Sequence, residues 1–112
     1  MIESYSFGRI KVKGVTHTSD LIVFNDHAKS EWWRIEGHKL HVEDLVDVLK
    51  AKPEILVVGT GYLGLMEVPL ETESRLQAEG IRIIAEKTGT AYRIYNDLSR
   101  STRVIGAFHL TC

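Results

Sequence analysis

The sequence predicts an α/β domain in which helices cover a mainly parallel or mixed sheet. Before residue 42, short apolar runs alternate with turn residues, as in strands joined by turns. After residue 42, helical and strand patterns follow one another, which is typical of a sheet covered by helices. The 112 residues, 44% of them hydrophobic, suit a single domain (1–112) with one core.

The first half contains three candidate strands. Residues 9–13 alternate apolar and basic side chains between two glycines, which indicates a half-buried strand. Residues 21–24 form a continuous apolar run, and residues 32–35 form a third run that ends before Gly37. Short strands separated by turn residues predict an antiparallel meander.

The second half begins with a helix and continues with three strands. Four apolar side chains of this helix fall on one face: Val42, Leu45, Val46 and Leu49. Acidic residues come early in the segment and lysines late, as the helix dipole prefers. Apolar runs predict strands at 55–58, 81–85 and 104–108.

Two further helices have recognisable start signals. Pro69 is favourable as the first residue of a helix, and Gly80 is a suitable stop, so we expect a helix over 69–79. Thr88 is a suitable N-cap for the last helix. Its apolar stripe consists of Ala91, Ile94, Tyr95 and Leu98. We expect Tyr95 in the core, whereas Asn96 beside it could end the helix or face a pocket.

The strand at 55–58 runs into Gly59-Thr60-Gly61-Tyr62-Leu63-Gly64, which matches the G-x-G-x-x-G dinucleotide fingerprint. In that fingerprint a helix begins inside the motif and directs its N–H groups at the pyrophosphate. Pro69 would fall in the second turn of such a helix, where proline costs about 3 kcal/mol. Glu86 lies where a ribose partner would fall, which is the feature that favours the cofactor. We predict no cofactor and a loop over 59–68.

A third interpretation of the glycines concerns a smaller ligand. Open α/β sheets commonly bind ligands at the carboxyl ends of their strands. Gly59, Thr60 and Gly61 could line such a crevice, with Asn96 or His109 at its rim.

The composition excludes several classes of function. With 14 basic and 15 acidic residues, the chain has no electrostatic footprint for nucleic acid. No apolar run approaches the roughly 20 residues that span a membrane, and the start of the sequence does not resemble a secretion signal. Cys112 is the single cysteine, so we expect a reducing, cytoplasmic location.

The cysteine and the histidines do not form a recognisable thiol or metal site. Cys112 and His109 are near in sequence, but positions three apart on a strand point to opposite faces. His38 and His41 precede the helix and have no cysteine partner, whereas closed zinc sites usually take four ligands. We therefore predict no catalytic residue and no metal site.

Trp32 and Trp33 are candidates for a partner surface. On a strand, neighbouring side chains point to opposite faces, so one indole should be buried and the other exposed. Aromatic residues are enriched where proteins contact each other. The sequence does not decide which of the two is exposed, and it does not indicate the oligomeric state.

An ordered set of short motifs resembles a known family. The motifs are residues 7–14, Trp33-Arg34, residues 57–61, Val68-Pro69, Gly80-Ile81, Ala91 with Tyr95-Asn96, and residues 106–112. Together they resemble the adipogenesis-associated domain family, which includes small archaeal and bacterial proteins. The mitochondrial complex I assembly factor called factor three is a more distant relative. Gly59, Gly61, Tyr95 and Asn96 match recurrent positions of the family.

The resemblance implies a three-layer α/β domain with a mixed central sheet, covering helices and an additional N-terminal β-hairpin layer. It also implies a family without an established catalytic activity, linked to fat-cell differentiation in animals. We therefore expect a non-enzymatic, cytoplasmic module that regulates or assembles other proteins through a protein partner. The alternatives are a small ligand- or nucleotide-binding protein or enzyme that uses the crevice at residues 59–64, and a respiratory complex assembly factor.

Overall fold

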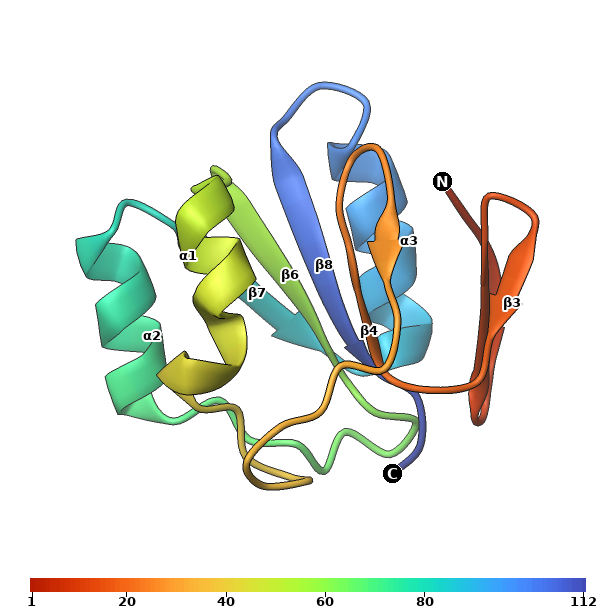
Figure 1. Ribbon diagram of the computed structural model, residues 1–112, viewed down its shortest axis with the longest axis horizontal. Helices are drawn as coiled ribbons and strands as arrows, with labels where there is room; N and C mark the ends of the chain where they lie inside the picture. The colour runs from red at the N-terminus through yellow and green to blue at the C-terminus, as the bar shows by residue number, and fades with distance from the viewer.

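The computed structural model describes all 112 residues and contains two β-sheets and three α-helices (Figure 1). A 3-10 helix, η1, precedes the first α-helix. Along the chain the elements are β1 (Ile2–Ser6), β2 (Arg9–Val12), β3 (Val15–His17), β4 (Leu21–Val23), β5 (Ala28–Lys29), η1 (Val42–Leu45), α1 (Val46–Ala51), β6 (Ile55–Thr60), α2 (Leu70–Ala78), β7 (Arg82–Glu86), α3 (Thr88–Leu98) and β8 (Val104–His109).

The central sheet has five strands in the order β5-β4-β8-β6-β7. Strand β6 runs parallel to its neighbours β7 and β8, whereas β4 pairs antiparallel with β8 and with β5. The prediction of a mixed central sheet is therefore confirmed. Strand β8 follows all the other strands in sequence and yet lies in the middle of the sheet.

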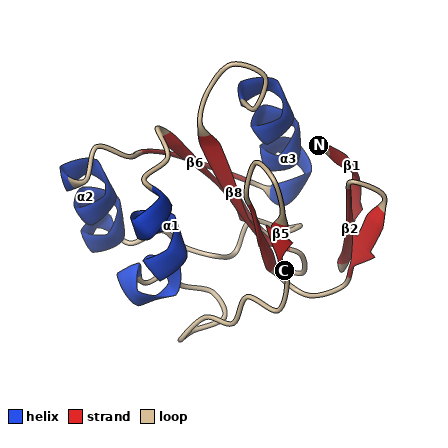
Figure 2. Ribbon diagram, turned by 45° about the horizontal axis from the view of Figure 1, so that its top comes forward, coloured by secondary structure: helices blue, strands red, loops and turns tan.

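Helices cover both faces of the central sheet, and the small sheet β1–β3 lies beside α3 (Figures 1 and 2). On one face, α1 and α2 contribute Val48 and Leu76 to a cluster of 12 buried residues. On the other face, Tyr95 of α3 and Ile10 of β2 belong to a second cluster of 11 buried residues. The predicted three-layer α/β architecture with an additional N-terminal β layer is confirmed, and Tyr95 lies in the core as expected.

The strands of the first half pair differently from the predicted meander. Strand β2 pairs with β1 and β3 in the small antiparallel sheet, whereas β4 leaves that sheet and pairs with β8. The prediction of a strand at 32–35 is wrong, because Asp44 holds this segment by side-chain contacts. Trp32 Nε1 donates to the Asp44 carbonyl oxygen (2.9 Å), and the Ile35 N–H donates to the Asp44 carboxylate (3.0 Å).

The helix predicted from Val42 begins as the 3-10 turn η1 and becomes α-helical at Val46. A 3-10 turn holds three residues instead of 3.6, so side chains beyond it are rotated relative to a continuous α-helix. Leu45 and Val48 are buried, whereas Val46 is 49% exposed. The predicted apolar face is therefore wrong at Val46.

Helix α2 begins at Leu70, one residue later than the sequence predicts. Pro69 is its N-cap, and the Pro69 carbonyl oxygen accepts the N–H groups of Thr72 (3.0 Å) and Glu73 (3.1 Å). Gly80 follows the helix with φ +79°. No helix continues directly from the glycine motif, so the prediction of a loop before Pro69 is confirmed, although β6 extends to Thr60.

Candidate functional site

The loop after β6, which we call the glycine loop (residues 59–64), lies at the carboxyl end of the central sheet. Gly59 and Gly61 are packed too tightly for any side chain. A Cβ atom on Gly59 would lie 2.7 Å from Thr88 Oγ1, and one on Gly61 would lie 2.5 Å from the Cys112 oxygen. Gly61 also has φ +111°, a conformation that L side chains rarely adopt. These two glycines are therefore required by close packing.

The segment after β8 accepts hydrogen bonds from two amide groups in and directly after the glycine loop. The Tyr62 N–H donates to the Thr111 carbonyl oxygen (2.7 Å), and the Leu65 N–H donates to the Cys112 oxygen (3.1 Å). The Gly64 N–H donates to the Gly61 carbonyl oxygen (3.2 Å) within the loop. A phosphate-binding loop needs such donors to be free. Here the chain itself uses them.

Thr88 connects the glycine loop to β8. The N-cap of α3 is Lys87, so the prediction of Thr88 as N-cap is wrong by one position. Thr88 is fully buried, and its Oγ1 accepts the Gly61 N–H (2.9 Å) and donates to the His109 carbonyl oxygen (2.6 Å). The hydroxyl satisfies two backbone groups at the end of the sheet, which explains why it does not cap its own helix.

The structure brings four of the five candidate crevice residues together and places the fifth elsewhere. Gly59 and Thr60 end β6, Gly61 follows them, and His109 ends the neighbouring strand β8 opposite Thr60. Asn96 instead lies on α3, where its side chain accepts the Ile2 N–H (2.9 Å) and donates to the Ile2 carbonyl oxygen (2.8 Å). Asn96 thus joins the small sheet to α3 and does not line the glycine loop.

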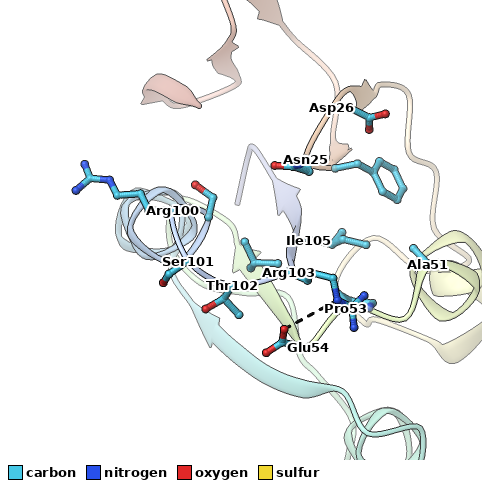
Figure 3. A pocket seen from close by; sticks show the side chains of 13 residues that line it. Asn25, Asp26, Ala51, Pro53, Glu54, Arg100, Ser101, Thr102, Arg103 and Ile105 are labelled. Atoms are coloured by element: carbon cyan, nitrogen blue, oxygen red, sulfur yellow. Dashed lines mark ion pairs between the residues drawn. The ribbon is translucent and has the colours of Figure 1, made fainter.

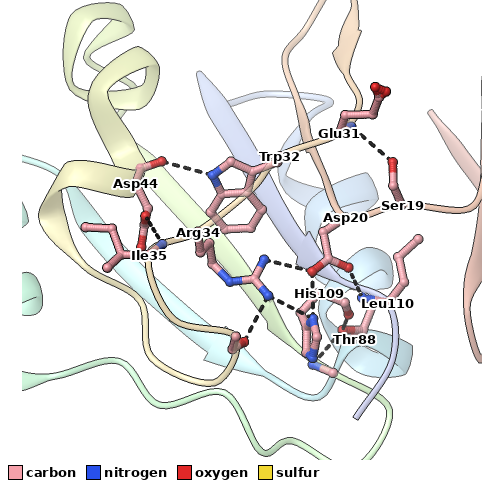
Figure 4. Close-up of polar contacts among 12 residues, drawn as sticks. Ser19, Asp20, Glu31, Trp32, Arg34, Ile35, Asp44, Thr88, His109 and Leu110 are labelled. Atoms are coloured by element: carbon pink, nitrogen blue, oxygen red, sulfur yellow. Dashed lines mark hydrogen bonds and ion pairs between the residues drawn. The ribbon is translucent and has the colours of Figure 1, made fainter.

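A buried charge cluster of Asp20, Arg34 and His109 lies beside these strand ends (Figure 4). Asp20 Oδ2 is 2.8 Å from Arg34 Nη1 and 2.7 Å from His109 Nδ1, and Asp20 Oδ1 accepts the Leu110 N–H (2.7 Å). Arg34 Nη2 donates to the Gly37 carbonyl oxygen (2.9 Å). The cluster therefore fixes the segment around residues 34–37 against β8.

The carboxylate of Asp20 is held in its ionised form. Burial disfavours the charge, but hydrogen bonds from His109, the Leu110 N–H and Arg34 outweigh it and hold the pKa of Asp20 below its ordinary value. Because Nδ1 of His109 faces this carboxylate, Nε2 is the nitrogen left for other contacts, and it is buried without a hydrogen-bond partner. A carboxylate–imidazole pair can act as a general base. In this structure Nε2 makes no hydrogen bond to a nucleophile.

The two tryptophans have different environments. Trp32 is buried (6% exposed) and stacks under Arg34, whose guanidinium carbon lies 4.8 Å from the ring centroid. Trp33 is 77% exposed. It borders a pocket of about 340 Å³, which we call the Trp33 groove. The groove is lined by four acidic and four hydrophobic residues together with Lys29, namely Glu31, Glu43, Asp44, Asp47, Ile22, Trp32, Trp33 and Val46.

A larger pocket, of about 570 Å³, lies at the opposite end of the central sheet, where β6 and β8 begin (Figure 3). Its charged side chains include Arg100, Arg103, Asp26 and Glu54. Arg103 donates to the Lys52 carbonyl oxygen (2.6 Å) and lies 3.9 Å from the Glu54 carboxylate. Both signs of charge are present, so the lining does not select an anion or a cation.

His27, His38 and His41 contact different side chains. His41 contacts the Glu36 carboxylate (2.7 Å), and His27 contacts Asp26 (2.7 Å). The ring of His38 packs edge-on against that of His109, with centroids 5.7 Å apart. No group of three or more histidine, cysteine, aspartate or glutamate side chains is arranged to hold a metal ion. None of the helices is long and apolar enough to cross a membrane.

Sequence reasoning did not identify Asp20 or Arg34 as members of a site. Asp20 is separated from His109 by 89 positions, and Arg34 from His109 by 75. The one signal in the sequence is that Arg34 follows two tryptophans, since guanidinium groups stack on aromatic rings. That signal suggests a stacked arginine, but it does not identify the carboxylate.

Comparisons with known proteins give a family and a fold. Residues 2–109 match the family described as a protein of unknown function (DUF498/DUF598). Among solved structures, the conserved hypothetical protein PH1505 from Pyrococcus horikoshii OT3 is 24% identical with a TM-score of 0.89, covering 100% of this chain and 99% of that chain. No curated protein matches the chain.

Two bacterial structures are similar as well. An outer membrane protein from Bartonella henselae is 23% identical with a TM-score of 0.82, covering 99% of this chain and 94% of that chain. A Bordetella pertussis protein described as a Mth938-like domain is 22% identical with a TM-score of 0.70, covering 98% of this chain and 85% of that chain. At these identities the likeness shows the fold alone.

Proposed function

The chain belongs to the DUF498/DUF598 family, and we propose that it is a non-enzymatic protein-binding module that holds its partner at the Trp33 groove. The observation that carries the proposal is the exposure of Trp33, 77% of whose surface is open to solvent beside a pocket that contains both acidic and apolar side chains. Tryptophan is among the residues that contribute most to binding energy at interfaces. A large exposed indole on a small domain is therefore a natural anchor.

The charges of the groove suggest the chemistry of the partner. Asp47 is paired with Lys29, and the Asp44 carboxylate accepts backbone N–H groups, so both are already engaged. Glu31 and Glu43 remain as unpaired carboxylates beside Trp33. A partner segment with one apolar side chain and a flanking lysine or arginine would complement this surface, because complementary charge favours encounter and register.

The buried charge cluster fixes the chain next to Trp33. Arg34 follows Trp33 directly, and its side chain is only 5% exposed and bound to Asp20 and Gly37. The backbone that carries the indole is therefore fixed before any partner arrives. A pre-organised anchor loses less conformational entropy on binding than a mobile one.

The finer roles implied by the sequence resemblance are part of this proposal. They comprise a cytoplasmic location, a regulatory role of the adipogenesis-associated type and, as an alternative, assembly of a respiratory complex. The regulatory role and the assembly role each require a protein partner. The rival function, binding of a small ligand or nucleotide at the glycine loop, would require residues 110–112 to leave the amides of Tyr62 and Leu65.

The test compares two variants that each remove one exposed apolar side chain. Trp33→Ala removes the anchor, and Leu70→Ala removes a side chain that is 75% exposed at the start of α2. A protein captured by the wild type is then titrated calorimetrically against the wild type, Leu70→Ala and Trp33→Ala. We expect Trp33→Ala to weaken binding by about 2 kcal/mol, since tryptophan hot spots have this magnitude.

A charge-reversal variant provides the second part of the test. Glu43→Lys should weaken the same complex, and the loss should diminish at high salt, because exposed charges are screened. A captured protein that binds Trp33→Ala as tightly as the wild type would contradict the proposal. A nucleotide or metabolite that stabilises the wild type, but not a folded Gly61 variant, would favour the rival function.

A further inference from the structure

The two edges of the central sheet differ in how they are protected. Strand β5 has only two residues, and Lys29 of this strand pairs with Asp47, so this edge is short and covered by charge. Strand β7 has five residues, none of them buried, and no strand lies beyond it. Exposed edge strands offer a row of unpaired N–H and C=O groups to another strand. Strand β7 is therefore the edge that is open to pairing.

The hydrogen bonds of β7 show which residues face outward. The Arg82 N–H donates to the Glu54 carbonyl oxygen (3.0 Å), and the Glu86 carbonyl oxygen accepts the Thr60 hydroxyl (3.1 Å), so both residues direct their backbone groups toward β6. Backbone groups of successive residues in a strand point alternately to the two sides. Ile83 and Ala85 consequently direct their N–H and C=O groups away from the sheet.

The sequence of β7, Arg-Ile-Ile-Ala-Glu, is complementary to itself when reversed. We propose that β7 pairs antiparallel with β7 of a second copy of this chain, about a two-fold axis at Ile84. In this register Ile83 lies opposite the partner's Ala85, and these are the residues whose backbone groups face outward. They would form a hydrogen-bonded pair on each side of the axis.

The side chains fit the same register. Arg82 lies opposite the partner's Glu86, and two-fold symmetry repeats this pair at the other end of the strand. Ile84 lies opposite the partner's Ile84 between the two charge pairs. All of these side chains project from the face of the sheet that α3 covers, because Ile84 is in register with Val57 of the second core cluster. Opposite charges directly across two strands stabilise their pairing.

Charged ends can also protect an edge strand from unwanted pairing. Such protection is strongest with charges of one sign, because a second copy then meets its own charge. In β7 the two ends carry opposite charges, so an antiparallel copy meets the complementary charge at both ends. This self-complementarity favours pairing between two copies over protection of the edge.

Charge reversal tests the register with the intact chain. Sedimentation equilibrium over the micromolar to millimolar range measures dimerisation of the wild type, Arg82→Glu, Glu86→Arg and the double variant. Each single change places like charges opposite each other twice in the dimer, so we expect the dissociation constant to rise by about tenfold or more. The double variant restores both pairs and should dimerise like the wild type.

Two controls distinguish disruption of the proposed register from unfolding and from a change in net charge. Arg9→Glu makes the same charge change on β2, at an exposed position in the small sheet, and should leave the dimer unchanged. Circular dichroism melting shows whether each variant remains folded. Amide hydrogen exchange of the wild type adds a backbone readout, in which protection at Ile83 and Ala85 should rise with protein concentration.

The dimerisation measurements decide between self-pairing of β7 and its absence. A wild-type dimer weakened by each single reversal, restored by the double reversal and insensitive to Arg9→Glu supports the pairing of β7 with itself. A wild-type chain that stays monomeric at all concentrations overturns it. A dimer that neither single reversal weakens, or that the double reversal fails to restore, overturns it as well.

Discussion

Asp20 is the residue on which the buried charge cluster depends. Its two oxygens contact Arg34, His109 and the Leu110 N–H, and the side chain of Arg34 is 5% exposed. Burial of a guanidinium is tolerable when a carboxylate pairs with it and costly when the carboxylate is removed. The charge of Asp20 is therefore the feature to alter.

We predict that Asp20→Asn lowers the free energy of unfolding by about 3 kcal/mol at neutral pH, because it leaves the guanidinium of Arg34 buried without a counter-charge. Urea unfolding followed by fluorescence measures this quantity. Asp26→Asn is the matched control, since Asp26 contacts only its exposed neighbour His27. A similar midpoint for Asp20→Asn and the control would contradict a stabilising role for the cluster.

The same variant has a defined pH dependence. The pKa of Asp20 is lowered in the folded chain, so its stabilising contribution is fully present above its unfolded pKa of about 3.9. It is lost as the pH falls through the lower folded value, because protons then bind the unfolded state first. The difference in unfolding free energy between wild type and Asp20→Asn should therefore shrink in this acidic range.

Sequence patterns cannot reveal such a cluster. Its members are brought together by β4, β8 and the segment before η1, and the contacts join positions 75 and 89 residues apart. Periodicity describes which side of its own element a residue faces. It does not describe which distant side chain lies opposite. His109 was identified only as a rim residue, and its partners Asp20 and Arg34 were not identified.

For helices and strands, the sequence predicts an element correctly where the interactions that determine it lie within that element. Pro69 and Gly80 mark the ends of α2 because both act through their own backbone conformation. The strand expected at 32–35 did not form, because Asp44 determines the conformation of that segment from outside it. Likewise, Thr88 bonds to Gly61 and His109 rather than capping its own helix.

Two glycines of different environment allow a paired prediction. Gly61→Ala should destabilise the chain by about 2 kcal/mol, because φ is +111° and the new Cβ atom would lie 2.5 Å from the Cys112 oxygen. Gly89→Ala lies in α3 with nothing within 4 Å of the new Cβ atom, and it should stabilise the chain by about 0.5 kcal/mol. Thermal and urea unfolding of both variants would show the opposite signs; destabilisation by Gly89→Ala would contradict the packing argument.

At the scale of the whole molecule, the two core clusters share the central sheet. Leu56 and Val58 face the α1 and α2 side, whereas Val57 between them faces α3. Neither cluster can lose its packing without exposing the sheet that the other needs. The overall architecture was predictable because the family resemblance covers nearly the whole chain, whereas the transfer of β4 from the small sheet to the central one was not.

We therefore predict a single cooperative unfolding transition. Leu76→Ala in the first cluster and Ile10→Ala in the second should each cost about 3 kcal/mol. Tryptophan fluorescence, which reports on Trp32 in the first cluster, should give the same urea midpoint as far-ultraviolet circular dichroism. Two separate midpoints in either variant would show that the clusters unfold independently.

The position of β8 has a consequence for biosynthesis. A ribosome delivers β4 and β6 long before β8, but β8 is the strand that must sit between them. Until β8 is synthesised, the growing chain contains two separate parts of the sheet whose inner strand edges are unpaired. Unpaired strand edges make incompletely folded chains prone to aggregate. Completion of the sheet must therefore await the synthesis of β8.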